Sequence, residues 1–431
     1  MKSSSVVTQY DTATLPNGLR LLIGRVPQAT SVAIGVWARV GGRHEPAHVS
    51  GISHFLEHLV FKGTRRRSCE QLKQGIEGTG GVLNGFTGEE FTCYLAKVLK
   101  PRVAQALDVL TDMLLHPRLH PDDIEKERTV VLEEIRMYLD QPAQHVHDVI
   151  SGLLWPDHPL GRSLAGTPET MARITRQDLQ RHRHRFYTPR NLVVSLVGDV
   201  SLPRVRQALL HAFRGQRGGV IRQPSPAPRV PANHRLRWEH RDTEQIHLCL
   251  ASHAVARRHP ARFTVDLLHG ILGANMSSRL FREVREKRAL AYEISSHVKH
   301  YQDTGGFIVM LGCEPRKLIP AVEVVLHELA RVARRGVSRA ELKRAKAFYR
   351  GQLLMGQEDT MEHMLWLGEC ALMEGRIPTV DATLRALDHV ERRDLRLAAR
   401  KLFQPGRLRL AVVGPRDAAG QRTLEQLLRV A

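Results

Sequence analysis

The chain has 431 residues, 42% hydrophobic and 25% charged, which suits a globular protein of about two to three domains. It contains no run of about 18 apolar residues, which excludes a membrane-spanning helix. The formal net charge is +20. Arginines recur along the whole chain without a dense basic block interleaved with aromatics, so we expect a basic solvated surface and no nucleic-acid partner.

The N-terminal residues 1–10 lack the apolar core that a signal peptide needs, and the first strand-like run follows at residues 19–23. The five cysteines are scattered and odd in number, which favours reduced thiols over a disulfide framework. We therefore expect a bacterial cytoplasmic location.

An apolar helix is predicted next, over residues 51–61, and it carries the pattern His-x-x-Glu-His. Residues four apart lie on one helix face, so His54 and His58 can present two imidazoles to one metal ion. Glu57 lies beside them and can take a proton from the water that such an ion activates. The alternative is a helix with two partly buried histidines and a solvated glutamate.

Residues 81–95 alternate well enough to predict a strand, with aromatic residues and several threonines that favour this state. An edge strand can take up an extended peptide as a further strand. Within this segment Asn84 precedes Gly85, and Asn-Gly is also a common turn pair.

A catalytic zinc site needs a third protein ligand and one open position. A helical segment at residues 125–135 contains four glutamates that could supply this ligand. Glu127 and Glu134 are seven residues apart and share a helix face, whereas Glu133 falls off that face. The residues alone do not decide among the four, and an ordinary acidic helix remains an alternative.

The two halves of the chain repeat each other. An amphipathic stripe at residues 103–114 recurs 215 residues later at 318–329, and a strand run at 192–198 recurs after 216 residues at 408–414. Residues 214–231 between the halves are rich in Gly, Pro and Ser, as an exposed linker is. We therefore expect duplicated domains.

The second copy lacks the candidate metal residues of the first. At an offset of 216, the positions that match the His-x-x-Glu-His set and the last candidate glutamate hold Gly270, Gly273, Ala274 and Arg350. An offset of 215 recovers His269 but no Glu-His pair. Packing of the repeat therefore does not require these residues, which favours a chemical role in the first copy.

Further motifs occur in order along nearly the whole chain, at residues 81–94, 158–162, 186–192 and 276–292. Together with His-x-x-Glu-His, which is the inverzincin pattern, they resemble the M16 metallopeptidases. This is the family of mitochondrial processing peptidase, pitrilysin and insulin-degrading enzyme. The one departure in residues 81–94 is Gly85, where the family usually has Ala.

The resemblance implies one Zn²⁺ per chain, bound by His54, His58 and Glu134. The third ligand of the family is a Glu far downstream of the second His, and here Glu134 follows His58 by 76 residues. Glu57 would be the general base. Glu127, two turns before Glu134, matches an acidic residue of the family that supports the site.

The resemblance also implies three residues that contact the substrate. Asn84 would face the peptide near the scissile bond. Arg285 and Tyr292, from the second half, would hold the peptide and stabilise the oxyanion, for which a guanidinium and a phenol are suitable donors. The alternative for this pair is a charged helix over residues 282–288 followed by a core tyrosine.

We expect an α+β fold, a duplicated metallohydrolase of the processing-peptidase type in which each half is an α/β sandwich with mostly antiparallel sheets. The predicted domains are 1–213 with the zinc site, a linker at 214–231, and a metal-free domain at 232–431. The resemblance implies a zinc endopeptidase that takes peptides or unfolded polypeptides into a chamber between two halves, and a homodimer. The alternative is a non-catalytic scaffold subunit.

Overall fold

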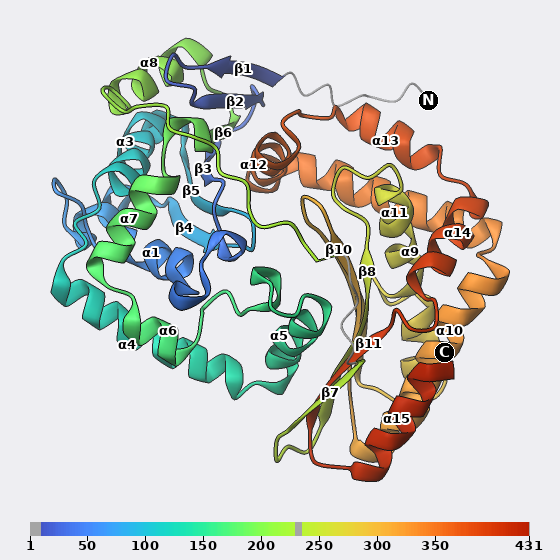
Figure 1. Ribbon diagram of the computed structural model, residues 1–431. Helices are drawn as coiled ribbons and strands as arrows, with labels where there is room; N and C mark the ends of the chain where they lie inside the picture. The colour runs from blue at the N-terminus through green and yellow to red at the C-terminus, as the bar shows by residue number, and fades with distance from the viewer. Residues whose placement is uncertain (1–9, 229–234, 431) are drawn as a thin grey trace. The chain divides into compact units, whose positions relative to one another are not determined.

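Two sheets, each covered by helices, organise the chain (Figure 1). The structure is a computed structural model that describes residues 10–228 and 235–430. The described part divides into two compact units. The first holds residues up to 135, 163–225 and 355–377, and the second holds 136–162, the described residues of 226–354, and 378–430. The expected α+β fold with mostly antiparallel sheets is confirmed.

The sheet of the first unit has six strands. In spatial order they are β1 (Tyr10–Thr14), β2 (Arg20–Arg25), β6 (Leu192–Gly198), β3 (Ser31–Ala38), β5 (Thr92–Leu99) and β4 (Val82–Thr87). All neighbours are antiparallel except β2 and β6. Every residue of β6 is buried, which explains why this central strand is an almost unbroken apolar run.

The sheet of the second unit has five strands with the matching order. They are β7 (Leu236–His240), β11 (Arg409–Gly414), β8 (Ile246–Ala254), β10 (Gly305–Cys313) and β9 (Glu293–His300). Its one parallel pair, β7 and β11, corresponds to β2 and β6 of the first sheet. The two sheets therefore share one topology, as the sequence repeat predicts, and the first adds β1 at its edge.

The helices cover these sheets. In the first half of the chain they are α1 (Ile52–Val60), α2 (Cys69–Ile76), α3 (Val103–Leu115), α4 (Pro121–Leu139), α5 (Pro142–Leu154), α6 (Pro168–Arg173), α7 (Arg176–Phe186) and α8 (Leu202–Ala212). In the second half they are α9 (Arg262–Leu272), α10 (Leu318–Arg335), α11 (Arg339–Glu358), α12 (Thr360–Glu369), α13 (Val380–Asp388), α14 (Arg392–Leu402) and α15 (Ala418–Val430). Among these described helices, none is long and apolar enough to cross a membrane.

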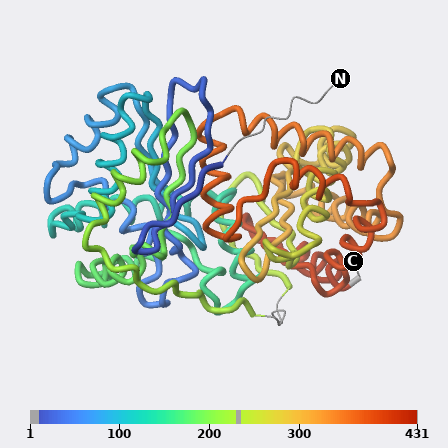
Figure 2. Tube along the Cα trace, turned by 90° about the horizontal axis from the view of Figure 1, so that it is seen from above, coloured from blue at the N-terminus to red at the C-terminus, as the bar shows by residue number. Residues whose placement is uncertain are grey.

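Each unit contains one helix from the other half of the sequence. α5 belongs to the second unit and packs on β8 and β11, whereas α12 belongs to the first unit and packs on β3 and β6. The orange-red turns of α12 lie beside the blue strands in both views (Figure 1 and Figure 2). The predicted domains 1–213 and 232–431 follow the sequence repeat and remain a prediction. The compact units differ from these ranges because α5 packs in the second unit and α12 in the first.

The single strand predicted over residues 81–95 is wrong in one respect. The segment forms an antiparallel hairpin of β4 and β5, closed by a turn in which Gly88 N donates to Phe91 O at 2.8 Å. The interruption falls at Gly88-Glu89-Glu90, where the chain reverses. Of the predicted linker, residues 214–228 contain no helix or strand, and residues 229–231 lie outside the described residues.

Gly368 of α12 allows this helix to pack closely on the first sheet. Trp37 Nε1 donates to Ser195 Oγ at 2.9 Å, and Ser195 Oγ donates to the Met364 carbonyl of α12 at 3.3 Å. A Cβ added at Gly368 would lie 2.0 Å from Trp37 Nε1 and 2.8 Å from Ser195 Oγ. Only a residue without a side chain therefore allows this approach.

We predict that Gly368→Ala lowers the free energy of unfolding by about 1–3 kcal/mol, because the methyl group overpacks the contact with Trp37. The melting temperature from circular dichroism measures the effect. Gly351→Ala is the matched control, since it also adds a methyl group to a helix but has no atom within 4 Å of the new Cβ. Equal melting temperatures for Gly368→Ala and the parent would contradict the prediction.

Candidate metal centre

The helix α1 begins at a buried carboxylate. Its N-cap, Gly51, has a left-handed backbone (φ 94°), and Glu45 accepts hydrogen bonds from Gly51 N at 2.7 Å and from Ser53 N at 2.8 Å. The first amides of a helix have no partner within the helix, and its N-terminus carries partial positive charge. Glu45 satisfies both conditions and so fixes where α1 starts.

The apolar face of α1 anchors the helix in the first unit. Phe55, Leu56 and Leu59 are at most 1% exposed. Their burial orients the opposite face, where His54 and His58 stand one turn apart and half-buried, with ring centroids 4.6 Å apart in an edge-to-face arrangement. The i, i+4 spacing thus places both imidazoles on one side, as predicted.

The helix α4 brings its glutamates to these imidazoles. Its apolar residues Ile124, Val131 and Ile135 are buried. Glu127 is buried as well, and Glu134 is partly exposed. The helical period that puts Glu127 and Glu134 on one face lets both reach α1.

Three donor groups converge at one point. Glu134 Oε2 lies 3.7 Å from His54 Nε2 and 3.6 Å from His58 Nε2. Two donor atoms of a tetrahedral zinc ion are about 3.4 Å apart, given zinc–nitrogen bonds of about 2.0–2.1 Å. Among the described residues, no other group of three or more His, Cys, Asp or Glu brings its donor atoms within 4.8 Å. The donor set therefore fits zinc.

The protonation of His54 also suits a metal ligand. Burial, and then the neighbouring His58, lower the pKa of His54 to about 4. Its imidazole is therefore neutral at pH 7, which is the form that binds a metal. Its Nδ1 is buried without a hydrogen-bond partner among the described residues, in contrast to Nδ1 of His58.

Glu127 orients His58. The Nδ1 of His58 is 3.2 Å from Glu127 Oε2, so a proton on Nδ1 leaves Nε2 to face Glu134. Lys62 forms an ion pair with the other oxygen of Glu127. Burial raises the pKa of Glu127, but the hydrogen bonds from His58 and Lys62 outweigh it and the pKa is lowered. Glu127 thus meets the ring nitrogen of His58 that does not face Glu134.

The pKa of His58 responds to the same carboxylates. Burial lowers it, but the hydrogen bond to Glu127 and the charges of Glu57 and Glu134 outweigh burial, so the pKa is raised. These negative charges surround the point where the three donors meet. They favour a cation at that point, either a proton on His58 or a metal ion.

Glu57 lies beside the donor set without belonging to it. It is 8% exposed, and Thr87 Oγ1 at the end of β4 donates to Glu57 Oε2 at 2.7 Å. Burial raises the pKa of Glu57, against smaller opposite effects of Thr87 and His58. A carboxylate with a raised pKa is better able to take and return a proton near neutral pH.

Sequence reasoning found the five polar residues of α1 and α4 but missed three that hold them in place, namely Glu45, Lys62 and Thr87. Thr87 belongs to the motif at residues 81–94, and Lys62 follows His58 by four residues, which are weak signals. Nothing local marks Glu45 as the cap of α1, because its partners are six and eight residues away.

Asn84 lies in β4, the last strand of its sheet, and its side-chain oxygen accepts from Gly85 N at 2.8 Å. The turn alternative is wrong, because Asn84 and Gly85 both pair with β5. Asn84 is exposed on this edge strand. Its contact with a substrate remains a prediction.

Arg285 and Tyr292 lie in the second unit. The Arg285 guanidinium stacks 5.0 Å from the ring centroid of Tyr292 and 4.8 Å from that of Phe281. Arg285 lies in a short π-helix, Phe281–Glu286. Tyr292 is 78% exposed, so the core-tyrosine alternative is wrong. The contribution of this pair to the metal centre stays a prediction.

Comparison with known proteins identifies the family. The chain is 38% identical over 423 residues to an uncharacterised zinc protease of Mycobacterium leprae, covering 97% of this chain and 94% of the relative. It is 34% identical over 406 residues to an uncharacterised zinc protease of Bacillus subtilis, covering 93% and 97%. Residues 20–168 match the family described as Insulinase (Peptidase family M16), and residues 173–349 match the Peptidase M16 inactive domain. The chain belongs to peptidase family M16.

Solved structures support the M16 fold. A protease from Helicobacter pylori superposes with a TM-score of 0.88 at 22% identity, over 95% of this chain and 100% of the other. A protein from Pseudomonas fluorescens described as a peptidase M16 inactive domain gives 0.85 at 19% identity, over 95% and 98%. The resemblance inferred from the motifs is confirmed. The match named for the inactive domain covers most of the half without the His and Glu set.

We predict that His58→Ala abolishes zinc binding, because it removes one of three donors and releases Glu127 from its hydrogen bond. Mass spectrometry of metals in the purified M16 protein should give one zinc per chain for the parent and almost none for the variant. His48→Ala, which removes an exposed imidazole ten residues away, should keep the metal. Full zinc occupancy in His58→Ala would remove His58 from the ligand set.

Proposed function

We propose that this M16 protein is a zinc-dependent endopeptidase that hydrolyses peptides or unstructured protein segments. The observation that carries the proposal is the meeting of His54, His58 and Glu134 beside the buried carboxylate of Glu57. Its relatives are named zinc proteases, which supports the same chemistry. By the family resemblance, the peptide would enter a chamber formed by the two halves of the protein.

His54, His58 and Glu134 would hold one zinc ion, leaving one position open. Zinc supplies a Lewis acid and lowers the pKa of the attacking water. Glu57 would accept the proton of that water and return it to the leaving amine, which its buried position and raised pKa favour. Glu127, paired with His58 and Lys62, would position the ligand rather than contact the substrate.

The remaining roles concern the substrate. β4 is an edge strand whose outer side could pair with an extended peptide backbone, and the exposed Asn84 would contact that peptide. Arg285 and Tyr292 would donate to the oxyanion that develops as the peptide bond is attacked. Tyr292 is exposed, and the half-buried Arg285 stacks on its ring, so the pair presents a phenol and a guanidinium side by side.

We predict that Glu57→Gln keeps its zinc but loses about 10²–10⁴-fold in the rate of peptide hydrolysis, because the general base is gone while the ligands remain. Cleavage of a fluorescence-quenched unstructured peptide measures the rate, and metal analysis measures the zinc. The amide retains the shape of the carboxylate and can still accept from Thr87.

Glu133→Gln is the control, since Glu133 is exposed and lies on the same helix as Glu134. Like Glu57→Gln, this substitution replaces one carboxylate by an amide. It should leave the rate within a few-fold of the parent. Activity of Glu57→Gln close to that of the parent would indicate another base. A zinc-loaded parent that cleaves no peptide would favour the scaffold alternative.

We also propose that the protein works as a homodimer in a bacterial cytoplasm. The location rests on the scattered, odd-numbered cysteines. The dimer rests on chain length, because one chain carries both the zinc set and Arg285 with Tyr292, yet has about half the length of a pitrilysin-like enzyme. Pairing with a second copy is then the simplest assembly. We propose no nucleic-acid partner.

Light scattering on the active protein should therefore give twice the chain mass of 48.6 kDa. An active species with the mass of one chain would contradict the dimer. Inactivity that only a second, different protein restores would indicate a heterodimer.

A further inference from the structure

A cavity of about 570 Å³ lies within the second unit, far along the chain from the metal residues. It is formed by the end of β8, the start of α9, and the helices α13 and α14. Its walls include Val265, Val390 and Leu402, which are nearly fully buried, and Leu397, which is 42% exposed. This volume falls in the range of small-molecule sites.

Cations gather at the same cavity. Lys401 and Arg407 line it, and neither forms an ion pair with a described residue. Asp394 is the one carboxylate among the described lining residues, and it caps the start of α14 by accepting from Glu391 N at 2.8 Å. His259 also lines the cavity and accepts from Ala261 N through Nδ1 at 3.0 Å, so the proton lies on Nε2. The polar part of the lining thus offers donors and positive charge.

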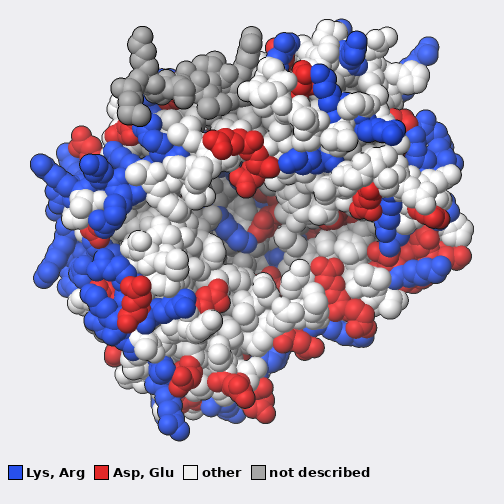
Figure 3. Space-filling model, turned by 180° about the vertical axis from the view of Figure 1, so that it is seen from behind, with Lys and Arg blue, Asp and Glu red and all other residues white. Residues whose placement is uncertain are grey.

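The surrounding surface adds to this charge. Lys and Arg side chains gather along the left edge of the back view (Figure 3). The last turn of α10 holds Arg334 and Arg335, and the last turn of α14 holds Arg400 and Lys401. Such a field raises the local concentration of anions.

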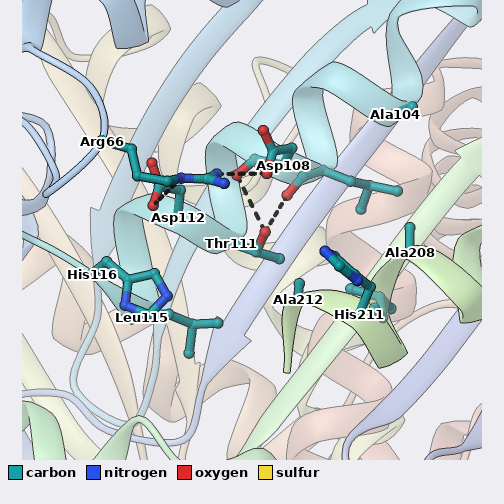
Figure 4. Close-up of a pocket in the computed structure, with 12 residues that line it drawn as sticks. Arg66, Ala104, Asp108, Thr111, Asp112, Leu115, His116, Ala208, His211 and Ala212 are labelled. Atoms are coloured by element: carbon teal, nitrogen blue, oxygen red, sulfur yellow. Dashed lines mark hydrogen bonds and ion pairs between the residues drawn. The ribbon is translucent and has the colours of Figure 1, made fainter. Parts of the chain in front are cut away.

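A cavity in the first unit provides a contrast. It measures about 420 Å³ and lies between α3 and α8 (Figure 4). There Arg66 is paired with Asp108 at 2.7 Å and with Asp112 at 3.3 Å. Its charges are balanced within the protein, so it shows no preference for a charged ligand.

We propose that the cavity of the second unit binds an aliphatic carboxylate, with the chain against Val265, Val390 and Leu402 and the carboxylate at Lys401 and Arg407. Apolar walls beside two cations without carboxylate partners are complementary to an anion that carries a hydrocarbon tail. The cavity belongs to the second unit, whereas His54, His58 and Glu134 belong to the first, and the proposal does not depend on peptide hydrolysis.

Calorimetric titration of the full chain with decanoate below its micelle concentration tests the site. Decanoate should bind at one site per chain. Shortening the tail to octanoate should weaken binding by up to about fourfold per methylene removed. Decanol, which has no charge, should bind about tenfold more weakly than decanoate.

Two variants locate the site. Lys401→Gln and Arg407→Gln should each weaken decanoate binding about tenfold, because each removes a charge-assisted contact. Arg400→Gln, which neutralises an exposed cation of the same helix outside the cavity, should bind as the parent does. The melting temperatures of all three variants should match that of the parent. A loss of binding can then be distinguished from a loss of folding.

Three results would overturn the proposal. The first is no heat of binding with decanoate, and the second is binding that is equal in the parent and in both cavity variants. The third is binding only to vesicles of anionic phospholipid, equally reduced by Arg400→Gln, which would indicate a charged membrane-facing surface instead of a cavity ligand.

Discussion

The candidate metal centre depends on one geometric constraint, which is the register between α1 and α4. Donor atoms from two helices must meet within the few ångströms that a single ion spans. Successive residues of a helix are about 100° apart around its axis, so a slip of one residue would turn both histidines away. Glu45 prevents such a slip at the start of α1, and the bond from His58 to Glu127 ties α1 to α4.

Charge balance is the second requirement of this centre. Glu57, Glu127 and Glu134 bring three carboxylates close to two imidazoles, and only Glu127 has a lysine partner, Lys62. The opposite pKa shifts of His54 and His58 follow from this arrangement, since burial dominates at His54 and the carboxylates dominate at His58. A divalent cation at the point of convergence would offset the remaining negative charge.

The duplicated scaffold explains why the second half matters to a centre that it does not contain. Five strands have the same order in both sheets, yet among the described residues the His and Glu set occurs in the first unit alone. The helix α12, from the second half, packs on β3 and β6 of the first sheet, and its His363 approaches Tyr10 Oη at 3.2 Å. The first half of the chain supplies every strand of the first sheet, but one helix that covers the sheet comes from the second half.

Much of the site could be predicted because it is local and periodic. The spacing of His54 and His58, and of Glu127 and Glu134, follows from the helical period, and the structure places each pair on one face. The segment 81–95 was predicted as a single strand, because its β pattern is continuous. The chain reverses at Gly88, so the segment forms two paired strands. No local sequence pattern predicts that α5 and α12 pack in the unit of the other half, because this depends on which sheet each helix covers.

The sequence by itself determined the family, the repeat and the helix faces that carry the histidines and glutamates, because these follow from residue order and short-range periodicity. Only the tertiary structure decided which atoms the glutamates meet, since the family resemblance implied their roles but not their contacts. Glu134 reaches Nε2 of both histidines, whereas Glu127 is buried behind Nδ1 of His58 and bonded to Lys62. Residues on one face of α4 acquire different roles because the packing of α1 against that face sets which atom each one meets.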